Sequence, residues 1–328
     1  MVAMTISTAQ AHAPKTASPL PAPAIETHDL AKRYGDTVAL AGLTMTVPRG
    51  EVFGFLGPNG AGKTTAVKLL LGLARATGGR GQVLGAPIGD LRARRRIGYL
   101  PELFRYQSWL RAREVLGAHS ELAGLPAEGR SREIEAVLQL VGLTERGSDR
   151  VGAFSKGMQQ RLGLAVALLG EPEVVFLDEP TSALDPVGRA DVRGIIRHLR
   201  ERGATVFLNS HLLGEVERVC DRVAIVDRGR VIAEGPIDEL LGARSLRVRA
   251  TGLDDGDRSS FARFGPLTVD GDWLTIRPIE PEVVPEVVAT IVAAGGRVHA
   301  VEPGRATLED RFLALLQVEE SPPTEPKP

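Results

Sequence analysis

The chain of 328 residues contains one cysteine, Cys220, which excludes a disulfide framework and fits a reducing compartment. It has no apolar run near the ~20 residues that a membrane-spanning helix needs, so we expect no transmembrane segment. Neither sign of charge dominates, because 40 basic residues stand against 41 acidic ones. We therefore expect no nucleic-acid partner and no bulk attraction to an anionic membrane.

The two ends of the chain have compositions that predict disorder. Residues 1–23 are rich in Ala, Thr, Ser and Pro, and residues 319–328 form a second proline-rich tail. The first segment lacks the unbroken apolar stretch of a secretion signal. We expect a disordered leader, a large unit over residues 24–241, a smaller unit over 242–318, and a disordered tail.

Lysine is scarce, with six lysines against 34 arginines, and Lys63 lies in a glycine-rich segment between an apolar strand and a helix. Such a loop points successive backbone N–H groups at one anion, at the positive end of a helix dipole. Lys63 reaches the outer phosphates, and the hydroxyl of Thr64 is placed to bind magnesium. The residues expected to bind the nucleotide here are Gly57, Pro58, Asn59, Gly60, Ala61, Gly62, Lys63, Thr64 and Thr65.

Apolar strands alternate with helices through the first unit, which predicts an α/β fold with a mostly parallel sheet covered on both faces. Ligands of such sheets bind at the carboxyl ends of the strands. The segment from about 90 to 165 is mainly helical and forms an inserted helical subdomain. The expected strands are 51–56, 174–178, 205–209 and 222–226, and the expected helices are 64–73, 111–123, 131–141, 157–169, 187–202 and 212–219.

Two acidic residues follow the apolar strand 174–178. Alone, an Asp-Glu pair is equally typical of a solvated turn. Beside a complete phosphate loop, Asp178 is expected to order Mg²⁺, and Glu179 to activate a water for in-line attack. The apolar strand would hold both carboxylates rigidly beside the phosphates.

Further motifs lie in a fixed order around this pair. Residues 154–161 (FSKGMQQR) resemble the signature motif of ATP-binding cassette (ABC) ATPases, and residues 178–185 (DEPTSALD) resemble that family's acidic motif and the loop after it. Asn209-Ser210-His211 matches the switch histidine, and Tyr34 precedes the phosphate loop where members stack an aromatic on adenine. The resemblance covers residues 24–240 and implies a P-loop NTPase cassette that hydrolyses ATP with Mg²⁺.

The resemblance also implies a site shared between two cassettes. Two copies, or one copy and a homologous cassette, are expected to pair head to tail on ATP. Ser155 and Gly157 at the start of the signature helix would then hold the partner's γ-phosphate, with Lys156 and Asp185 at the interface. His211 would contact the γ-phosphate and sense its loss.

Three positions depart from the commonest family pattern. Lys156 replaces a glycine, Met158 replaces a glutamine, and Glu102 stands where a glutamine usually follows Tyr-Leu-Pro. A carboxylate at 102 can still bind Mg²⁺ or position water, although it adds negative charge near a triphosphate. The residues at these three positions resemble those of the exporter branch that moves drugs, antibiotics, polysaccharides or ions.

Aromatic residues make up only 4% of the chain, yet four of them gather near the start of the helical segment. Such a cluster either packs that segment or forms a docking surface. In the family this region receives a short helix of the membrane subunit. The resemblance therefore implies a separate multi-span permease and a cytoplasmic location at the inner face of the membrane. The four residues are Tyr99, Phe104, Tyr106 and Trp109.

The last 75 or so residues of the folded part are expected to form a small α+β accessory module, with strands 245–251, 267–270, 273–277 and 297–301 and helices 282–294 and 307–317. Residues 308–312 (LEDRF) resemble the end of the exporter branch's accessory domain. Dimer support, regulation and a purely structural cap all remain open as its role.

Two other functions are compatible with a phosphate loop. A cassette ATPase acting on ribosomes or DNA usually has two cassettes in one chain or long coiled-coil insertions, whereas this chain has one phosphate loop, no heptad run and a balanced charge. A nucleotide switch that does not hydrolyse ATP would need neither Glu179 nor His211. We therefore expect a transport ATPase.

Overall fold

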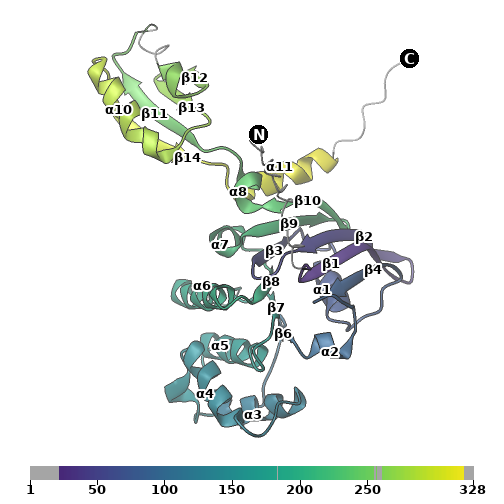
Figure 1. Ribbon diagram of the computed structural model, residues 1–328. Helices are drawn as coiled ribbons and strands as arrows, with labels where there is room; N and C mark the ends of the chain where they lie inside the picture. Colours follow the sequence, from purple (N-terminus) through teal and green to yellow (C-terminus); the bar gives the residue numbers. More distant parts are fainter. Residues whose placement is uncertain (1–21, 183, 255, 257–260, 321–328) are drawn as a thin grey trace, which may run out of the picture.

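The structure is a computed structural model that describes residues 22–320, apart from 183, 255 and 257–260. Most of the predicted leader and the last eight residues of the predicted tail lie outside the described residues. The described part contains three β-sheets, arranged as a compact α/β body with a smaller lobe above it (Figure 1).

The central sheet has six strands in the order β10-β9-β3-β8-β7-β6. All neighbours are parallel except β10, which runs antiparallel to β9. The mostly parallel sheet predicted from the sequence is therefore confirmed. Its strands are β3 (Val52–Leu56), β6 (Ile97–Leu100), β7 (Val174–Asp178), β8 (Thr205–Asn209), β9 (Arg222–Asp227) and β10 (Arg230–Pro236).

Alternate residues of these strands enter two separate cores, because successive side chains of a strand point to opposite faces. Phe53 and Phe55 lie in one core, whereas Val52 and Leu56 of the same strand lie in the other. Strands buried on both faces read as continuous apolar runs, which is why these strands were visible in the sequence.

The first core is closed by a four-stranded antiparallel sheet and by α1 (Lys63–Leu70). That sheet has the order β2-β1-β4-β5. Its strands are half exposed, carry charged residues and contain irregularities of register, so their alternation is too weak to predict. They are β1 (Ile25–Tyr34), β2 (Thr37–Val47), β4 (Gly78–Val83) and β5 (Ala86–Pro87).

Helices cover the other face, where α3 to α7 share the second core. Figure 1 shows α3, α4 and α5 together at the lower end of the body. The segment from 90 to 165 is not helical throughout, because β6 lies inside it and pairs with β7. The helices are α2 (Leu91–Arg94), α3 (Ala112–Leu122), α4 (Arg130–Leu140), α5 (Lys156–Ala167), α6 (Pro186–Glu201) and α7 (Leu213–Val219), with 3₁₀ turns η1 (Thr144–Arg146) and η2 (Val151–Ala153).

The third sheet forms the upper lobe, in the order β12-β13-β11-β14, with all neighbours antiparallel. One face packs on α10 through Val287 and Ile291. This lobe comprises β11 (Ser245–Thr251), η3 (Phe261–Phe264), β12 (Leu267–Asp270), β13 (Trp273–Ile276), η4 (Pro281–Val283), α10 (Val284–Ala293) and β14 (Arg297–Gly304).

The last helix, α11 (Leu308–Glu320), leaves this lobe and returns to the body, where it packs on α7 and α8 (Ile237–Leu241). Leu308 is fully buried in the second core, and its backbone N–H donates to Glu217 Oε2 at 2.9 Å. The guanidinium of Arg311 donates to the carbonyl of Leu240 at 2.6 Å. Within the described residues, no helix has both the length and the apolar character to cross a bilayer.

Phe207 organises the first core, and its replacement by alanine is expected to destabilise the fold strongly. Its ring centroid lies 5.1 Å from that of Phe176, 5.2 Å from Phe55 and 5.9 Å from Phe53. Burial is complete, so Phe207→Ala should lower the free energy of unfolding by about 3–5 kcal/mol, measured by urea denaturation. Phe207→Leu, which leaves a smaller cavity, should lose clearly less. A loss below about 1 kcal/mol for the alanine variant would contradict this account of the core.

Candidate functional site

The phosphate loop joins β3 to α1 and depends on two glycines that have no room for a side chain. A Cβ on Gly57 would lie 2.2 Å from the carbonyl oxygen of Val226. A Cβ on Gly62 would lie 2.3 Å from the carbonyl oxygen of Ala39, and Gly62 also has a φ of +97°. Gly62 is the N-cap of α1, and no side chain caps this helix. The backbone N–H groups of its first turn are therefore free to bind an anion.

Lys63 turns back over this loop. Its Nζ donates to the carbonyl oxygens of Gly57 at 2.8 Å and Pro58 at 3.1 Å. Partial burial lowers the pKa of Lys63, while the carboxylates of Glu179, Asp178 and Glu102 act in the opposite direction. The lysine thus lies within electrostatic reach of three acids that the sequence placed 39 or more positions away. A bound phosphate would replace the loop carbonyls as its partner.

Asp178 ends β7 and is held by the strand beside it. Asn209 is its register partner on β8, and the Asn209 side-chain N–H donates to Asp178 Oδ1 at 2.5 Å. Asp178 is only 4% exposed. Burial raises its pKa, and nearby Glu102 and Glu179 raise it further, against the hydrogen bond from Asn209 and the charge of Lys63. A buried carboxylate with excess negative charge around it is a ready position for a cation.

Glu179 follows directly and has a strained backbone, with a φ of +51°. Its N–H donates to the carbonyl of Asn209 at 2.8 Å, which fixes the turn. Oε1 accepts the backbone N–H of His211 at 2.9 Å. Oε2 lies 2.8 Å from His211 Nδ1, and this buried oxygen accepts no hydrogen bond from the described residues. Such an oxygen can accept a proton from water.

His211 follows β8 and is positioned by its own backbone contact with Glu179. Its side chain is 57% exposed. The ring therefore contacts Glu179 through Nδ1, while more than half of the side chain is exposed to a ligand or a second chain.

The structure supplies a partial cation site. Among the described residues, no group of three or more His, Cys, Asp or Glu side chains is placed to hold a metal ion. A cation here would need oxygens of a bound nucleotide in addition to Asp178 and the Thr64 hydroxyl. Mg²⁺ is commonly bound in this way, through one or two protein oxygens plus substrate phosphates, so the residues fit it. Glu102 is exposed in the bend after β6, and only its charge reaches the site.

Ser155 is the N-cap of α5, where its hydroxyl accepts the N–H of Met158 at 3.2 Å. A Cβ on Gly157 would meet nothing closer than Leu184 at 3.7 Å, so the chain itself does not require glycine there. Lys156 is exposed beside them. α5 packs in the second core and α1 in the first, on opposite faces of the central sheet. No hydrogen bond or ion pair links Ser155 to the phosphate loop among the described residues.

Asp185 and Tyr34 lie at the edges of the predicted site. Asp185 is the N-cap of α6, accepting the N–H of Gly188 at 2.7 Å. Tyr34 ends β1 and is 48% exposed. Lys32 Nζ lies 4.7 Å from the centroid of the Tyr34 ring, a cation–π contact on one face of the ring.

The sequence did not predict the roles of Asn209 and Ala39. Asn209 orients Asp178 and carries a buried Oδ1 with no hydrogen-bond partner. Asn209 ends the strand expected over residues 205–209, but its contact with Asp178 depends on the pairing of that strand with 174–178, which the sequence did not predict. Ala39 belongs to β2, and its contact with Gly62 joins sequence positions that no motif connects.

Comparison with known proteins identifies the fold and the family. The ABC transporter family model matches residues 40–182. An uncharacterised ABC transporter ATP-binding protein of Synechocystis is 46% identical, covering 96% of this chain and 90% of the relative. The chain belongs to the family of ABC transporter ATP-binding proteins.

Two further ABC proteins extend the comparison. A Nod factor export ATP-binding protein of Burkholderia orbicola is 35% identical over 89% of this chain and 96% of its own length. A solved ATP-binding subunit of an ABC transporter superposes with a TM-score of 0.60 at 32% identity, covering 66% of this chain and 91% of that one. The prediction of a P-loop NTPase cassette is confirmed, and this ABC subunit binds and hydrolyses ATP.

Replacing Asp178 by asparagine is expected to stabilise the nucleotide-free subunit. A raised pKa means that the folded chain binds this proton more tightly than the unfolded chain, so stability is lost as pH rises from the ordinary value of 3.8 through the raised one. Asp178→Asn removes that loss. Its melting temperature should exceed that of the wild type at pH 7, and the difference should shrink as the pH falls toward 4.

The control is Asp185→Asn, which changes an exposed helix cap to an equally good cap and should leave the melting temperature nearly unchanged. An Asp178→Asn variant that melts below the wild type at pH 7 would show that the charge of Asp178 does not destabilise the nucleotide-free subunit.

Proposed function

We propose that this subunit drives a separate membrane permease that exports its cargo, and that two cassettes share each ATP. The observation that carries the proposal is the convergence of Asp178 and Glu179, at the end of β7, on Lys63 of the phosphate loop, with the backbone N–H of His211 donating to Glu179. Export is supported by the relative named for Nod factor export. Attachment to the permease would hold the subunit at the cytoplasmic face of the membrane.

Nucleotide binding begins with an exchange of partners at the loop. The γ-phosphate takes Lys63 from the carbonyls of Gly57 and Pro58, which are the weaker acceptors. Thr64 and Asp178 would hold Mg²⁺ together with oxygens of the nucleotide, and the adenine would stack on the exposed ring of Tyr34. When bound, the cation neutralises charge that develops on the phosphates.

Hydrolysis uses the free oxygen of Glu179. Oε1 is anchored by the His211 N–H, so Oε2 is the atom that accepts a proton from the attacking water. The exposed His211 ring then faces the γ-phosphate. The backbone N–H of His211 is hydrogen-bonded to Glu179. A movement of His211 on loss of that phosphate would therefore be transmitted to the base.

The second cassette supplies what one chain lacks. The Ser155 hydroxyl caps α5 in the isolated chain, and the helix N-terminus favours an anion. Space beside Gly157 and the exposed charge of Lys156 are both suited to a partner's γ-phosphate. Asp185, on the turn after Glu179, would lie at the same interface. The upper lobe would support or regulate this pairing.

The aromatic cluster divides into packing and surface residues. Phe104 and Tyr106 pack against the second core, with ring centroids 5.3 Å apart, and Tyr99 packs against the first. Trp109 is 68% exposed and Leu103 is 87% exposed. We assign docking of the permease to these two apolar side chains. Action on ribosomes or DNA has no comparable support, since the net charge is −1.

Glu179→Gln is expected to separate ATP binding from hydrolysis. Glutamine keeps an oxygen for the His211 N–H but cannot accept the proton, so turnover should fall at least ~100-fold. ATP affinity should be retained, and ATP should trap a dimer visible by size-exclusion chromatography. Lys63→Ala is the contrasting variant and should weaken ATP binding instead. Wild-type turnover in Glu179→Gln would reject Glu179 as the base.

Trp109→Ala is expected to weaken recruitment by membranes that contain the permease while leaving ATP affinity unchanged. The ring is exposed, so its loss should hardly affect the melting temperature. Co-sedimentation with permease-containing vesicles measures recruitment. Val187→Ala, another exposed apolar residue but on α6, is the control. Equal recruitment of wild type and Trp109→Ala would remove Trp109 from the docking surface.

A further inference from the structure

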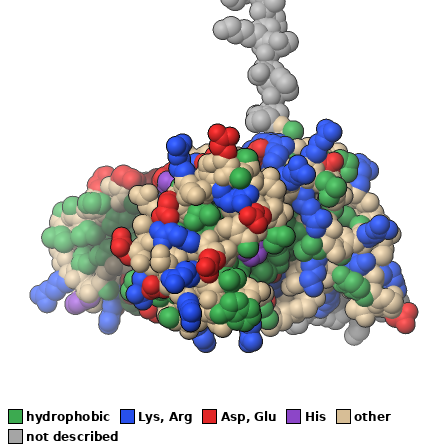
Figure 2. All heavy atoms as spheres, turned by 90° about the horizontal axis from the view of Figure 1, so that it is seen from below, with side chains coloured by type: hydrophobic (Ala, Val, Ile, Leu, Met, Phe, Trp, Pro, Cys, Tyr) green, Lys and Arg blue, Asp and Glu red, His purple; other side chains and the backbone are tan. Residues whose placement is uncertain are grey.

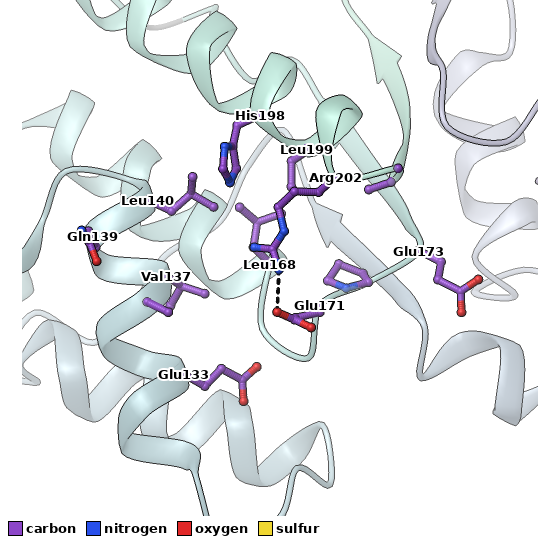
Figure 3. A pocket seen from close by; sticks show the side chains of 14 residues that line it. Glu133, Val137, Gln139, Leu140, Leu168, Glu171, Glu173, His198, Leu199 and Arg202 are labelled. Carbon is purple, nitrogen blue, oxygen red and sulfur yellow. Dashed lines mark hydrogen bonds and ion pairs between the residues drawn. The ribbon is translucent and has the colours of Figure 1, made fainter.

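A cavity of about 510 Å³ lies away from the ATP site, between α4, the turn after α5 and the C-terminal end of α6. Its walls include Val137 and Leu140 of α4, Leu168 after α5 and Leu199 of α6. Figure 3 shows these side chains converging from three elements around one hollow. The volume and the apolar lining are typical of pockets that bind small organic molecules.

Two acidic side chains lie at the edge of the cavity. In Figure 3, Glu133 approaches from α4 and Glu171 from the turn opposite. Glu171 is already paired, because Arg202 donates to it at 2.7 Å. Glu133 accepts the backbone N–H of Gly170 but makes no ion pair with any described residue.

The third acidic residue that lines the cavity has ion-pair partners. Glu173 lines the cavity and is paired with Arg49 and Arg96, which approach from outside it. His198 is the remaining titratable lining residue and stands on the α6 side. Among the described residues, the lining carboxylate that has no ion-pair partner is therefore that of Glu133, which accepts only a backbone hydrogen bond. It lies at the edge of an apolar hollow, where a ligand ammonium group gains both an ion pair and burial of its apolar part.

We propose that this cavity binds an amphiphilic organic amine, with the apolar body among Val137, Leu168 and Leu199 and the ammonium group against Glu133. An anion of the same shape meets Glu133 with repulsion, and a neutral molecule gains only the apolar contacts. The cavity therefore selects by charge as well as by shape.

The position of the cavity links it to the proposed interface between cassettes. α5 and α6 both end at this cavity, and their N-terminal caps are Ser155 and Asp185. At 1.5 Å per residue these helices reach ~18 and ~24 Å from their caps. A molecule wedged between them is expected to alter how the two caps meet a second cassette. This coupling rests on the proposed function, whereas binding itself does not.

Three probes with the same phenylbutyl body separate charge from shape: 4-phenylbutylamine, 4-phenylbutan-1-ol and 4-phenylbutyrate. Binding to the full-length, nucleotide-free protein at pH 7 is measured by ligand-observed NMR titration. We expect the amine to bind at least fivefold more tightly than the alcohol, and the carboxylate more weakly than the alcohol. Equal affinity of amine and alcohol, or no binding of any probe, would overturn the proposal.

Two variants test the location. Glu133→Gln keeps an acceptor for the Gly170 N–H and should bring the amine to within twofold of the alcohol, with alcohol affinity unchanged. Ala136→Trp places a bulky ring in the cavity from the exposed side of α4 and should weaken all binding at least tenfold. Unchanged amine affinity in Ala136→Trp, with a native circular dichroism spectrum, would overturn the proposal.

The matched control is Glu135→Gln, which removes a carboxylate from the same helix outside the cavity, where it pairs with Arg113. It should leave the preference for amine intact. A loss of preference equal to that of Glu133→Gln would indicate diffuse surface charge instead of a site.

ATP turnover tests the coupling separately. A saturating amine should change the wild-type rate at least twofold and leave the Ala136→Trp rate unchanged. If the amine binds but the ATP turnover rate of the wild type is unchanged, the coupling is rejected and the binding site stands. Absence of turnover without any probe rejects the proposed function and leaves the binding result standing.

Discussion

The register between β7 and β8 is the constraint on which the rest of the site depends. Asp178 stands opposite Asn209, so the two strands end at the same level. From that level the chain turns into Glu179 on one strand and His211 on the other, and the backbone N–H of His211 reaches the Glu179 carboxylate. A slip of one residue would direct Asp178 to the opposite face of the sheet and break every one of these contacts. Phe207, in the middle of β8, packs among three rings of β3 and β7 and supports that register.

The phosphate loop, by contrast, is held from outside its own strand and helix. The backbone N–H of Gly229 donates to the carbonyl of Ala61 at 3.0 Å, and the N–H of Ala41 donates to the carbonyl of Gly229 at 3.1 Å. The antiparallel sheet thus reaches the loop through a chain of backbone hydrogen bonds. A loop whose amides must stay free for a ligand cannot bind itself together with those amides, so its rigidity comes from neighbours.

Strands with two buried faces and motifs with fixed spacing were predictable from the sequence. β7 and β8, which are buried on both faces, have the predicted bounds, and Glu179 and His211 meet as neighbouring strand ends require. The antiparallel sheet was not predictable, because strands such as β1 bury only part of one face and shift register along their length. β6 was missed because four residues carry too little pattern. The roles proposed for Ser155 and Asp185 beyond capping involve a second cassette, so one chain shows only their capping contacts.

The return of α11 to the body gives the upper lobe two attachment points. The chain enters the lobe after α8 and leaves it through Arg305, whose guanidinium donates to the Gly242 carbonyl at 3.2 Å and pairs with Asp238 at 2.8 Å. Entry and exit are therefore clamped side by side, and the exit helix is fixed to α7, the helix that follows His211. A domain on one flexible tether moves independently, whereas a domain attached at two clamped points moves together with the helices that hold it. Small rotations of α7 would be magnified at the far end of the lobe.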